Sequence, residues 1–239
     1  SPLEICPYVI EFRSVEDLKP TSEAVVRLAG HRDSISTDVL RRTSHGNPED
    51  AWLSWSMIGC GSLGSKIAMH LTRSGRAPVT VIDNDTIEPH NYARHSCLPV
   101  SADLDSMFYS SKAGELALDV SKLAQETDGY RIDANTVLRT KELRRKLKLE
   151  KSKALLNTSA SSVLRETLSF TDWPKGKAPR VMEANLMGDS DVGFFSVSGA
   201  GSNPNSSDLT TEFYRHMRSD DVLRAKVMDQ SADKIVIGQ

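Results

Sequence analysis

The sequence predicts an α/β fold in which a doubly wound, mostly parallel sheet carries helices on both faces. Two observations predict it. Apolar, strand-like segments alternate with helical patterns along most of the chain, and a glycine-rich turn, GCGSLG at residues 59–64, separates the first such strand from the first such helix. Because a parallel strand must return over a face of its sheet, this alternation favours parallel pairing with right-handed crossovers.

The elements around the glycine turn are the clearest. Residues 52–58 (WLSWSMI) predict a buried strand, residues 65–74 a helix that Gly75 ends, and residues 79–83 (VTVID) a second buried strand. Strand, glycine turn, helix and strand form a βαβ unit with parallel strands, so we expect a Rossmann-like sheet.

The rest of the chain continues the alternation. Further helices are predicted at residues 112–125, 141–150, 161–169 and 208–228, and further strands at 132–138, 154–159, 180–186 and 192–198. Residues 1–50 show one weak helical pattern near 21–28 and are predicted to form an N-terminal arm. We expect residues 51–239 to form a single domain.

The composition excludes several classes of protein. Thirty Lys and Arg against 32 Asp and Glu leave no basic surplus, so nucleic acid is not expected as a partner. No apolar run is long enough to span a membrane and no cleavable signal is visible, so we expect a cytoplasmic protein. Cys6, Cys60 and Cys97 form neither a CxxC pair nor an even set, which argues against a disulfide framework or a zinc site.

The glycine turn predicts a nucleotide site. Gly59, Gly61 and Gly64 fit the GxGxxG pattern, in which a tight turn brings phosphate to the unpaired N–H groups of a helix N-terminus. Asp83 ends the second strand, where a carboxylate can accept hydrogen bonds from ribose hydroxyls. These features fit NAD and ATP alike.

The residues that follow are more specific. Asp83-Asn-Asp85 is followed by Asn91-Tyr-Ala-Arg94, and Lys112 then opens a helix. This series resembles the ThiF/MoeB/HesA superfamily, the adenylating domain of ubiquitin-activating enzymes. The spacing from Asp83 to Arg94 is most similar to the bacterial members, including those of ubiquitin-like conjugation systems in antiviral defence.

The resemblance implies an ATP-dependent adenylyltransferase. It would adenylate the C-terminal glycine carboxylate of a ubiquitin-like protein and release pyrophosphate, with ATP and magnesium as cofactors. An Arg and a Lys on the phosphates make chemical sense, because a carboxylate that attacks phosphate must overcome charge repulsion. The implied nucleotide-binding residues are Gly59, Gly61, Gly64, Asp83, Asp85, Asn91, Arg94 and Lys112, of which Arg94 and Lys112 would be catalytic.

The chain departs from the family at one turn. Family members carry a D-x-T-D turn after the fourth strand, and one of its carboxylates helps to hold magnesium. Here Asn157 and Ala160 stand at those positions, although Arg165 fits the arginine that often follows. We therefore predict no protein ligand for the metal, which ATP phosphates and water would hold. As partners we expect the ubiquitin-like protein, a conjugating enzyme, and a second copy or a related subunit in a dimer.

Other interpretations remain open at this stage. The altered turn also fits a catalytically quiet scaffold that pairs with an active subunit, and the glycine motif alone fits an NAD-dependent oxidoreductase. Cys97 is a weak candidate for a thioester-forming nucleophile, and His95 is expected to be solvated or to cap a helix. The basic run Lys141–Lys153 is either a solvated helix face or a docking site for an acidic partner.

Overall fold

The computed structural model describes residues 8–11, 14–15, 19, 23–29, 34–44, 53–99, 110–188 and 190–228. Its contacts divide the chain into two compact units, residues 1–35 and 36–239. In the smaller unit, β1 (Tyr8–Ile10) and β2 (Val26–Leu28) form an antiparallel hairpin. The predicted helix near residues 21–28 is therefore wrong, since its β-branched residues favour an extended backbone.

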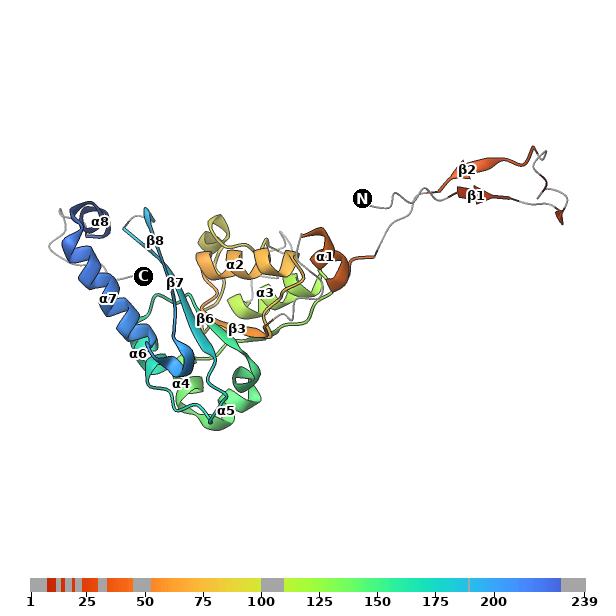
Figure 1. Ribbon diagram of the computed structural model, residues 1–239. Coiled ribbons are helices and arrows are strands. Elements are labelled where there is room, and N and C mark those ends of the chain that lie inside the picture. Colours follow the sequence, from red (N-terminus) through yellow and green to blue (C-terminus); the bar gives the residue numbers. More distant parts are fainter. Residues whose placement is uncertain are drawn as a thin grey trace. The chain divides into compact units, whose positions relative to one another are not determined.

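The larger unit contains a six-stranded sheet with the order β5-β4-β3-β6-β7-β8 (Figure 1). β8 is antiparallel to β7, and every other pair of neighbouring strands is parallel. The predicted Rossmann-like, mostly parallel sheet is confirmed. Its strands are β3 (Trp55–Ile58), β4 (Thr80–Ile82), β5 (Asp128–Tyr130), β6 (Ala154–Asn157), β7 (Arg180–Met187) and β8 (Val192–Val197).

The order of the strands reverses between β3 and β6. The chain runs outward from β3 to β4 and β5, and then returns to place β6 on the other side of β3. At such a switch point the connections leave in opposite directions, which opens a crevice at the carboxyl ends of the strands. Gly59 follows β3 and Thr158 follows β6, so both turns border this crevice.

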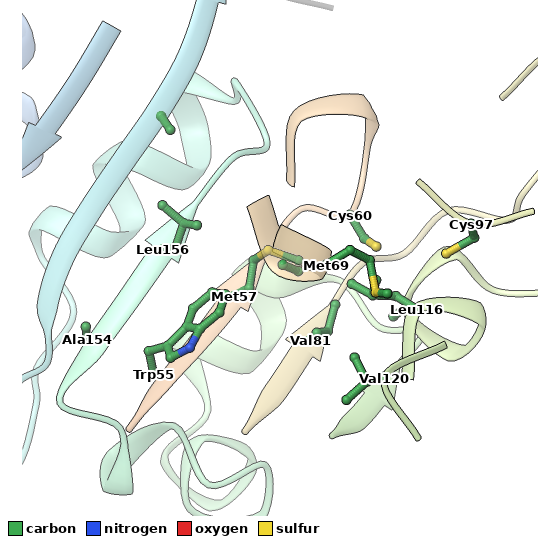
Figure 2. Packing of buried hydrophobic residues seen from close by; sticks show 13 residues of the cluster. Trp55, Met57, Cys60, Met69, Val81, Cys97, Leu116, Val120, Ala154 and Leu156 are labelled. Carbon is green, nitrogen blue, oxygen red and sulfur yellow. The ribbon is translucent and has the colours of Figure 1, made fainter. Parts of the chain in front are cut away.

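Helices cover both faces of the sheet. Met57 and Ile58, which are consecutive in β3, belong to two different apolar clusters. Met69 of α2 and Leu116 of α3 share the first cluster with Met57 (Figure 2). Elements α4, α5 and α6 contribute to the second cluster. The helices are α1 (Thr37–Thr43), α2 (Ser62–Arg73), α3 (Lys112–Ser121), α4 (Ala134–Arg139), α5 (Lys141–Lys146), α6 (Ser162–Ser169), α7 (Ser206–Ser219) and α8 (Asp221–Val227).

Two further predicted elements are wrong, and carboxylate caps explain both. Residues 132–138 form the start of a helix rather than a strand, because Asp133 accepts hydrogen bonds from the backbone N–H groups of Asn135 and Thr136 and so begins α4. The predicted helix at 208–228 is two helices, because Asp220 ends α7 and caps α8 by accepting from Leu223 N–H. In the part of the chain that the structure describes, no helix is long and apolar enough to cross a membrane.

A helix that the sequence analysis missed belongs to the larger unit. Arg41 of α1 donates from Nε to the carbonyl oxygen of Gly75 over 3.0 Å, at the end of α2. A Cβ on Gly75 would lie 2.7 Å from Thr37 O, so the two helices approach closely at this glycine. The division into an arm (1–50) and an adenylation domain (51–239) stays a prediction, although α1 packs with the larger unit.

A buried ion pair joins α6 to β7. Arg165 donates to both carboxylate oxygens of Glu183, with Nη2 2.7 Å from Oε1, and the Glu183 side chain is completely buried. Glu183 also accepts a hydrogen bond of 3.1 Å from Asn185 Nδ2. Because a buried charge is tolerated only when it is paired, each partner depends on the other.

We expect Glu183→Gln to lower the free energy of unfolding by about 3–5 kcal/mol, because the Arg165 guanidinium would stay buried without its counter-charge. Urea denaturation measures the loss. In the control variant Arg165→Met/Glu183→Leu both charges are removed, and we expect it to be more stable than the single variant. A single variant as stable as the native chain would contradict the analysis.

Candidate functional site

A cleft of about 630 Å³ lies at the carboxyl ends of β3, β4, β6 and β7. It occupies the switch point of the sheet, where an open α/β fold places its ligand. Gly64, which the sequence also predicts for the site, lies in α2 behind the turn and does not line the cleft. The predicted residues that do line it are Gly59, Gly61, Asp83, Asp85, Asn91, Arg94 and Lys112.

The three glycines have different physical roles. Gly59 has φ +90°, and a Cβ there would lie 2.8 Å from Ser159 N. A Cβ on Gly64 would lie 2.4 Å from both Gly59 O and Thr158 Oγ1, so this glycine lets α2 pack against the turns. Gly61 has open space where its Cβ would be and caps the N-terminus of α2 without a side chain. The first and third glycines therefore allow close packing, and Gly61 leaves the helix N-terminus open to the cleft.

Asp83 is held rigidly at the end of β4. Its Oδ2 accepts from Cys60 N–H over 2.5 Å, and its Oδ1 accepts from Asp85 N–H over 2.8 Å. Burial raises the pKa of this carboxyl, and these two hydrogen bonds act in the opposite direction. The carboxylate is thereby fixed beside the glycine turn.

Lys112 extends into the same cleft from the first residue of α3. Its Nζ lies 2.8 Å from Asp85 Oδ2, and its side chain is only 13% exposed, compared with 60% for Asp85. The backbone N–H of Lys112 also donates to Asp85 O over 3.2 Å. These contacts connect α3 to the turn after β4, so Asp85 positions the lysine ammonium at the cleft.

Asn91 lies in a short 3-10 helix, Pro89–Ala93, and Arg94 is the residue that ends this helix. Asn91 Oδ1 accepts from Glu88 N–H over 2.9 Å, so this oxygen shapes the turn. Arg94 is exposed, and Ser62 Oγ donates to its carbonyl oxygen over 3.2 Å. No ion pair involves its guanidinium within the described residues.

His95 is buried, which corrects the expectation that it is solvated. Its Nε2 lies 2.7 Å from Cys60 O, and its Nδ1 accepts from Cys97 N–H over 3.2 Å. The neutral ring with its proton on Nε2 satisfies both contacts. Burial lowers the pKa of His95 from its usual 6.5. His95 therefore joins the glycine turn to the turn that contains Arg94.

The turn after β6 contains no carboxylate. Asn157 Oδ1 accepts from both Ser159 N–H, over 3.1 Å, and Ser159 Oγ, over 2.8 Å. Ala160 lines the cleft with φ +53°, a backbone conformation that Asn and Asp adopt more readily than Ala. Ser161 caps α6 by accepting from Leu164 N–H over 3.2 Å. The turn therefore presents hydroxyls and a helix N-terminus to the cleft.

Two helix N-termini and two cations at the cleft can bind the anionic groups of a ligand, among three carboxylates in the same lining. The N-termini of α2 and α6 both open into it, and Arg94 and Lys112 add two cations. Among the described residues, no group of three or more His, Cys, Asp or Glu side chains is arranged to hold a metal ion. The carboxylates that line the cleft are Asp83, Asp85 and Asp133, and each already has a hydrogen-bond or ion-pair partner in the chain.

Neither thiol of the larger unit is a nucleophile in this structure. Cys60 and Cys97 are buried, with 0% and 1% exposure. Burial raises the pKa of Cys60, and burial together with neighbouring Asp119 raises the pKa of Cys97 to about 12. Because the thiolate is the reactive form, Cys97 does not have the properties of a thioester-forming residue. Cys6 lies outside the described residues.

The ThiF family model matches residues 52–106, the segment that contains the glycine turn, Asp83, Asn91 and Arg94. The match agrees with the family predicted from the sequence and covers less than a quarter of the chain. No curated protein matches the chain significantly.

Solved structures show partial similarity. Crystal structures of E. coli MccB with succinimide and with ATP are 16% and 17% identical, with TM-scores of 0.46 and 0.44. The matches cover 70% and 57% of this chain, but only 48% and 38% of the MccB chain in each structure. A structure of PaaA is 19% identical with a TM-score of 0.41, over 56% of this chain and 38% of that chain. This chain thus spans less than half the length of each, and nothing about substrates or partners follows.

Sequence reasoning missed the part of the cleft that β7 and α4 provide. Asn185 and Leu186 line it from β7, and Asn135 lines it from the start of α4. The sequence gives one indication of this part of the cleft, because Asn185 lies two residues after Glu183 on a buried strand. His95 was also missed, although it directly follows Arg94.

We expect the protein to lose stability below about pH 6.5. The folded state binds the His95 proton less readily than the unfolded chain, so unfolding takes up a proton in acid and stability falls as pH falls through 6.5. The measurement is the drop in Tm between neutral pH and pH about 5.5. This drop in Tm should be smaller in the His95→Gln variant, whose side chain still has a hydrogen-bond donor and an acceptor. Equal drops in both proteins would refute the assignment.

Proposed function

We propose that this chain is an ATP-dependent adenylating domain that activates the C-terminal glycine carboxylate of a ubiquitin-like protein. The observation that carries the proposal is the convergence of the α2 N-terminus, Asp83, Arg94 and Lys112 on one cleft. Hydride transfer develops no new charge on the cofactor phosphates, whereas adenylation does, so an Arg and a Lys at this place favour ATP over NAD.

The triphosphate and the ribose of ATP each have a suitable partner in the cleft. The triphosphate fits the open N-terminus of α2 at Gly61, with Arg94 and Lys112 on its oxygens. The Asp83 carboxylate is the acceptor for ribose hydroxyls, because its two backbone hydrogen bonds hold it in place and leave lone pairs free. These roles are proposals for the residues that the sequence predicted.

The chemistry needs charge stabilisation more than acid or base catalysis. A carboxylate oxygen of the substrate attacks the α-phosphorus, the bond from phosphorus to the bridging oxygen breaks, and pyrophosphate leaves with that electron pair. Arg94 and Lys112 offset the negative charge that accumulates on the phosphate oxygens. Asp85 is a positioning residue, since it orients the Lys112 ammonium.

A protein substrate is supported by an exposed apolar face beside the cleft. Phe195 is 63% exposed and pairs with Ala184 across the β7–β8 hairpin, and Leu186 is 48% exposed on the same face. Ala184 and Leu186 also line the cleft. A ubiquitin-like protein that covers this face can direct its terminal glycine into the cleft. The proposal includes a bacterial conjugation system, with a conjugating enzyme and a dimeric assembly as further partners.

The residues do not fit a magnesium ion held by the protein. Magnesium prefers carboxylate and water oxygens in octahedral geometry, and the turn after β6 provides Ala160 where a carboxylate would reach the cleft. Asn157 Oδ1 is already used by Ser159. Magnesium therefore enters only with the ATP phosphates and water, and no step is assigned to it.

A catalytically quiet scaffold is the alternative that the same turn favours. Such a subunit would keep the fold and pair with an active partner. Calorimetric titration with ATP separates the two functions, because a scaffold has no need for tight nucleotide binding.

We expect Arg94→Ala and Lys112→Ala each to lower ATP–pyrophosphate exchange by about a hundredfold, because each removes a cation from the developing charge. The assay uses the purified chain with a ubiquitin-like protein encoded beside its gene. Lys66→Ala is the control, since Lys66 is exposed on α2 and does not line the cleft. Exchange that survives in both variants would refute the roles, and no exchange in the native chain despite ATP binding would favour the scaffold.

We expect the native chain to bind ATP with less than about a threefold change in Kd when EDTA replaces magnesium, because no protein group holds the ion. Ala160→Asp should create a preference for magnesium, since Asp suits φ +53° and places a carboxylate in the cleft. Calorimetry measures both. Ala225→Asp, an exposed substitution on α8, is the control. A native chain that requires magnesium to bind ATP would contradict this account.

A further inference from the structure

A second cavity, about 730 Å³ in volume, lies on the outer side of α4, α5 and α6. We call it the α4–α6 groove. Leu138 and Arg139 at the end of α4, Lys141 of α5, and Val163 and Phe170 along α6 form its walls. The nucleotide cleft is lined by other residues of α4 and α6, so the groove is a separate site.

Arg144 builds the floor of the groove. The residue is 5% exposed, and its guanidinium donates to Leu138 O and, over 2.8 Å, to Asp172 O. The guanidinium carbon, Cζ, lies 5.5 Å from the centre of the Trp173 ring. These contacts connect α4, α5 and the segment after α6, so the groove is already formed in the free chain. A preformed groove loses little entropy when it binds a partner.

One wall of the groove is apolar and exposed. Val163 is 59% exposed and Phe170 is 76% exposed. Val163 lies in the first turn of α6 and Phe170 is the residue that ends this helix, seven positions or about two turns later, so the two lie on the same side. Exposed apolar side chains beside a cavity indicate a surface that a partner covers.

The opposite wall is cationic. Residues 139–153 contain eight Lys and Arg and two Glu, whereas the whole chain has a net charge of −2. Arg139 and Lys141 line the groove, and Arg145 follows Lys141 by one helical turn. None of these three cations forms an ion pair within the described residues.

Two carboxylates, Glu166 and Asp172, also line the groove, and Glu166 accepts a hydrogen bond of 3.0 Å from Ser207 Oγ of α7. With Arg139, Lys141 and Arg144 in the same lining, cations outnumber carboxylates by three to two. Elsewhere in the basic run, Lys148 is neutralised by Asp128 at 2.6 Å. Lys146, Lys151 and Lys153 also form no ion pair within the described residues, so unpaired cations extend along the run, and Arg139 and Lys141 are the exposed ones that line the groove.

We propose that the α4–α6 groove binds an acidic segment of a partner protein, with an apolar side chain against Val163 and Phe170 and carboxylates against Arg139, Lys141 and Arg145. The apolar wall favours a protein over a nucleic acid, whose backbone needs cations and gains little from Val or Phe. This function goes beyond nucleotide activation and does not depend on it.

Fluorescence anisotropy with three labelled probes tests the proposal. The first is a short peptide of Glu and Leu residues, the second replaces each Leu by Ser at the same charge, and the third is a single-stranded oligonucleotide. The native chain should bind the first probe at least about tenfold more tightly than the other two, and salt should weaken that binding.

Variants locate the binding. Lys141→Glu/Arg145→Glu and Phe170→Ser should each raise the Kd for the first peptide at least about tenfold, whereas Lys226→Glu on α8, apart from α5 in Figure 1, should leave it unchanged. All these residues are exposed, and an unchanged Tm confirms that each variant folds. Equal binding of both peptides, tighter binding of the oligonucleotide, no binding, or no effect of the groove variants would each overturn the proposal.

Discussion

The close contact between the turn after β3 and the turn after β6 is the constraint on which the site depends. Gly59 leaves no room for a side chain against Ser159, and Thr158 Oγ1 donates to Gly59 O over 2.8 Å. Because these two turns touch, the N-termini of α2 and α6 open into the same cleft. Asp83 and His95 then attach the remaining turns to Cys60, the residue between the first two glycines.

Those parts of the molecule that local patterns determine could be predicted from the sequence. The strand before Gly59, the helix after it and the strand ending at Asp83 follow from apolar runs and glycine positions. The cleft residues that the sequence predicted lie in one short stretch of chain, apart from Lys112. Lys112 comes 18 residues after Arg94 in the sequence, and its contact with Asp85 holds it at the cleft.

The remainder depends on contacts between distant segments. Residues 132–138 contain β-branched and apolar residues that fit a strand, but the cap provided by Asp133 outweighs that preference. His95 was expected to be solvated or to cap a helix, because a single histidine gives no sign of what covers it. The position of β7 beside β6 brings Asn185 and Leu186 to the cleft, and no local pattern predicts which strands become neighbours.

The nucleotide cleft and the α4–α6 groove are connected by a direct contact. Thr167, which lines the groove, donates from Oγ1 to Asn135 Oδ1 over 2.9 Å, and Asn135 lines the cleft. Both residues lie on helices that the sheet and Arg144 hold in place. Coupling between two ligands requires each to favour a different arrangement of the elements between them. Since α4 and α6 both pack into the second apolar cluster against the sheet, the contact by itself makes the two sites neighbours. A partner in the groove would change nucleotide binding only if it moved α4 or α6, and with them Asn135 or the N-terminus of α6.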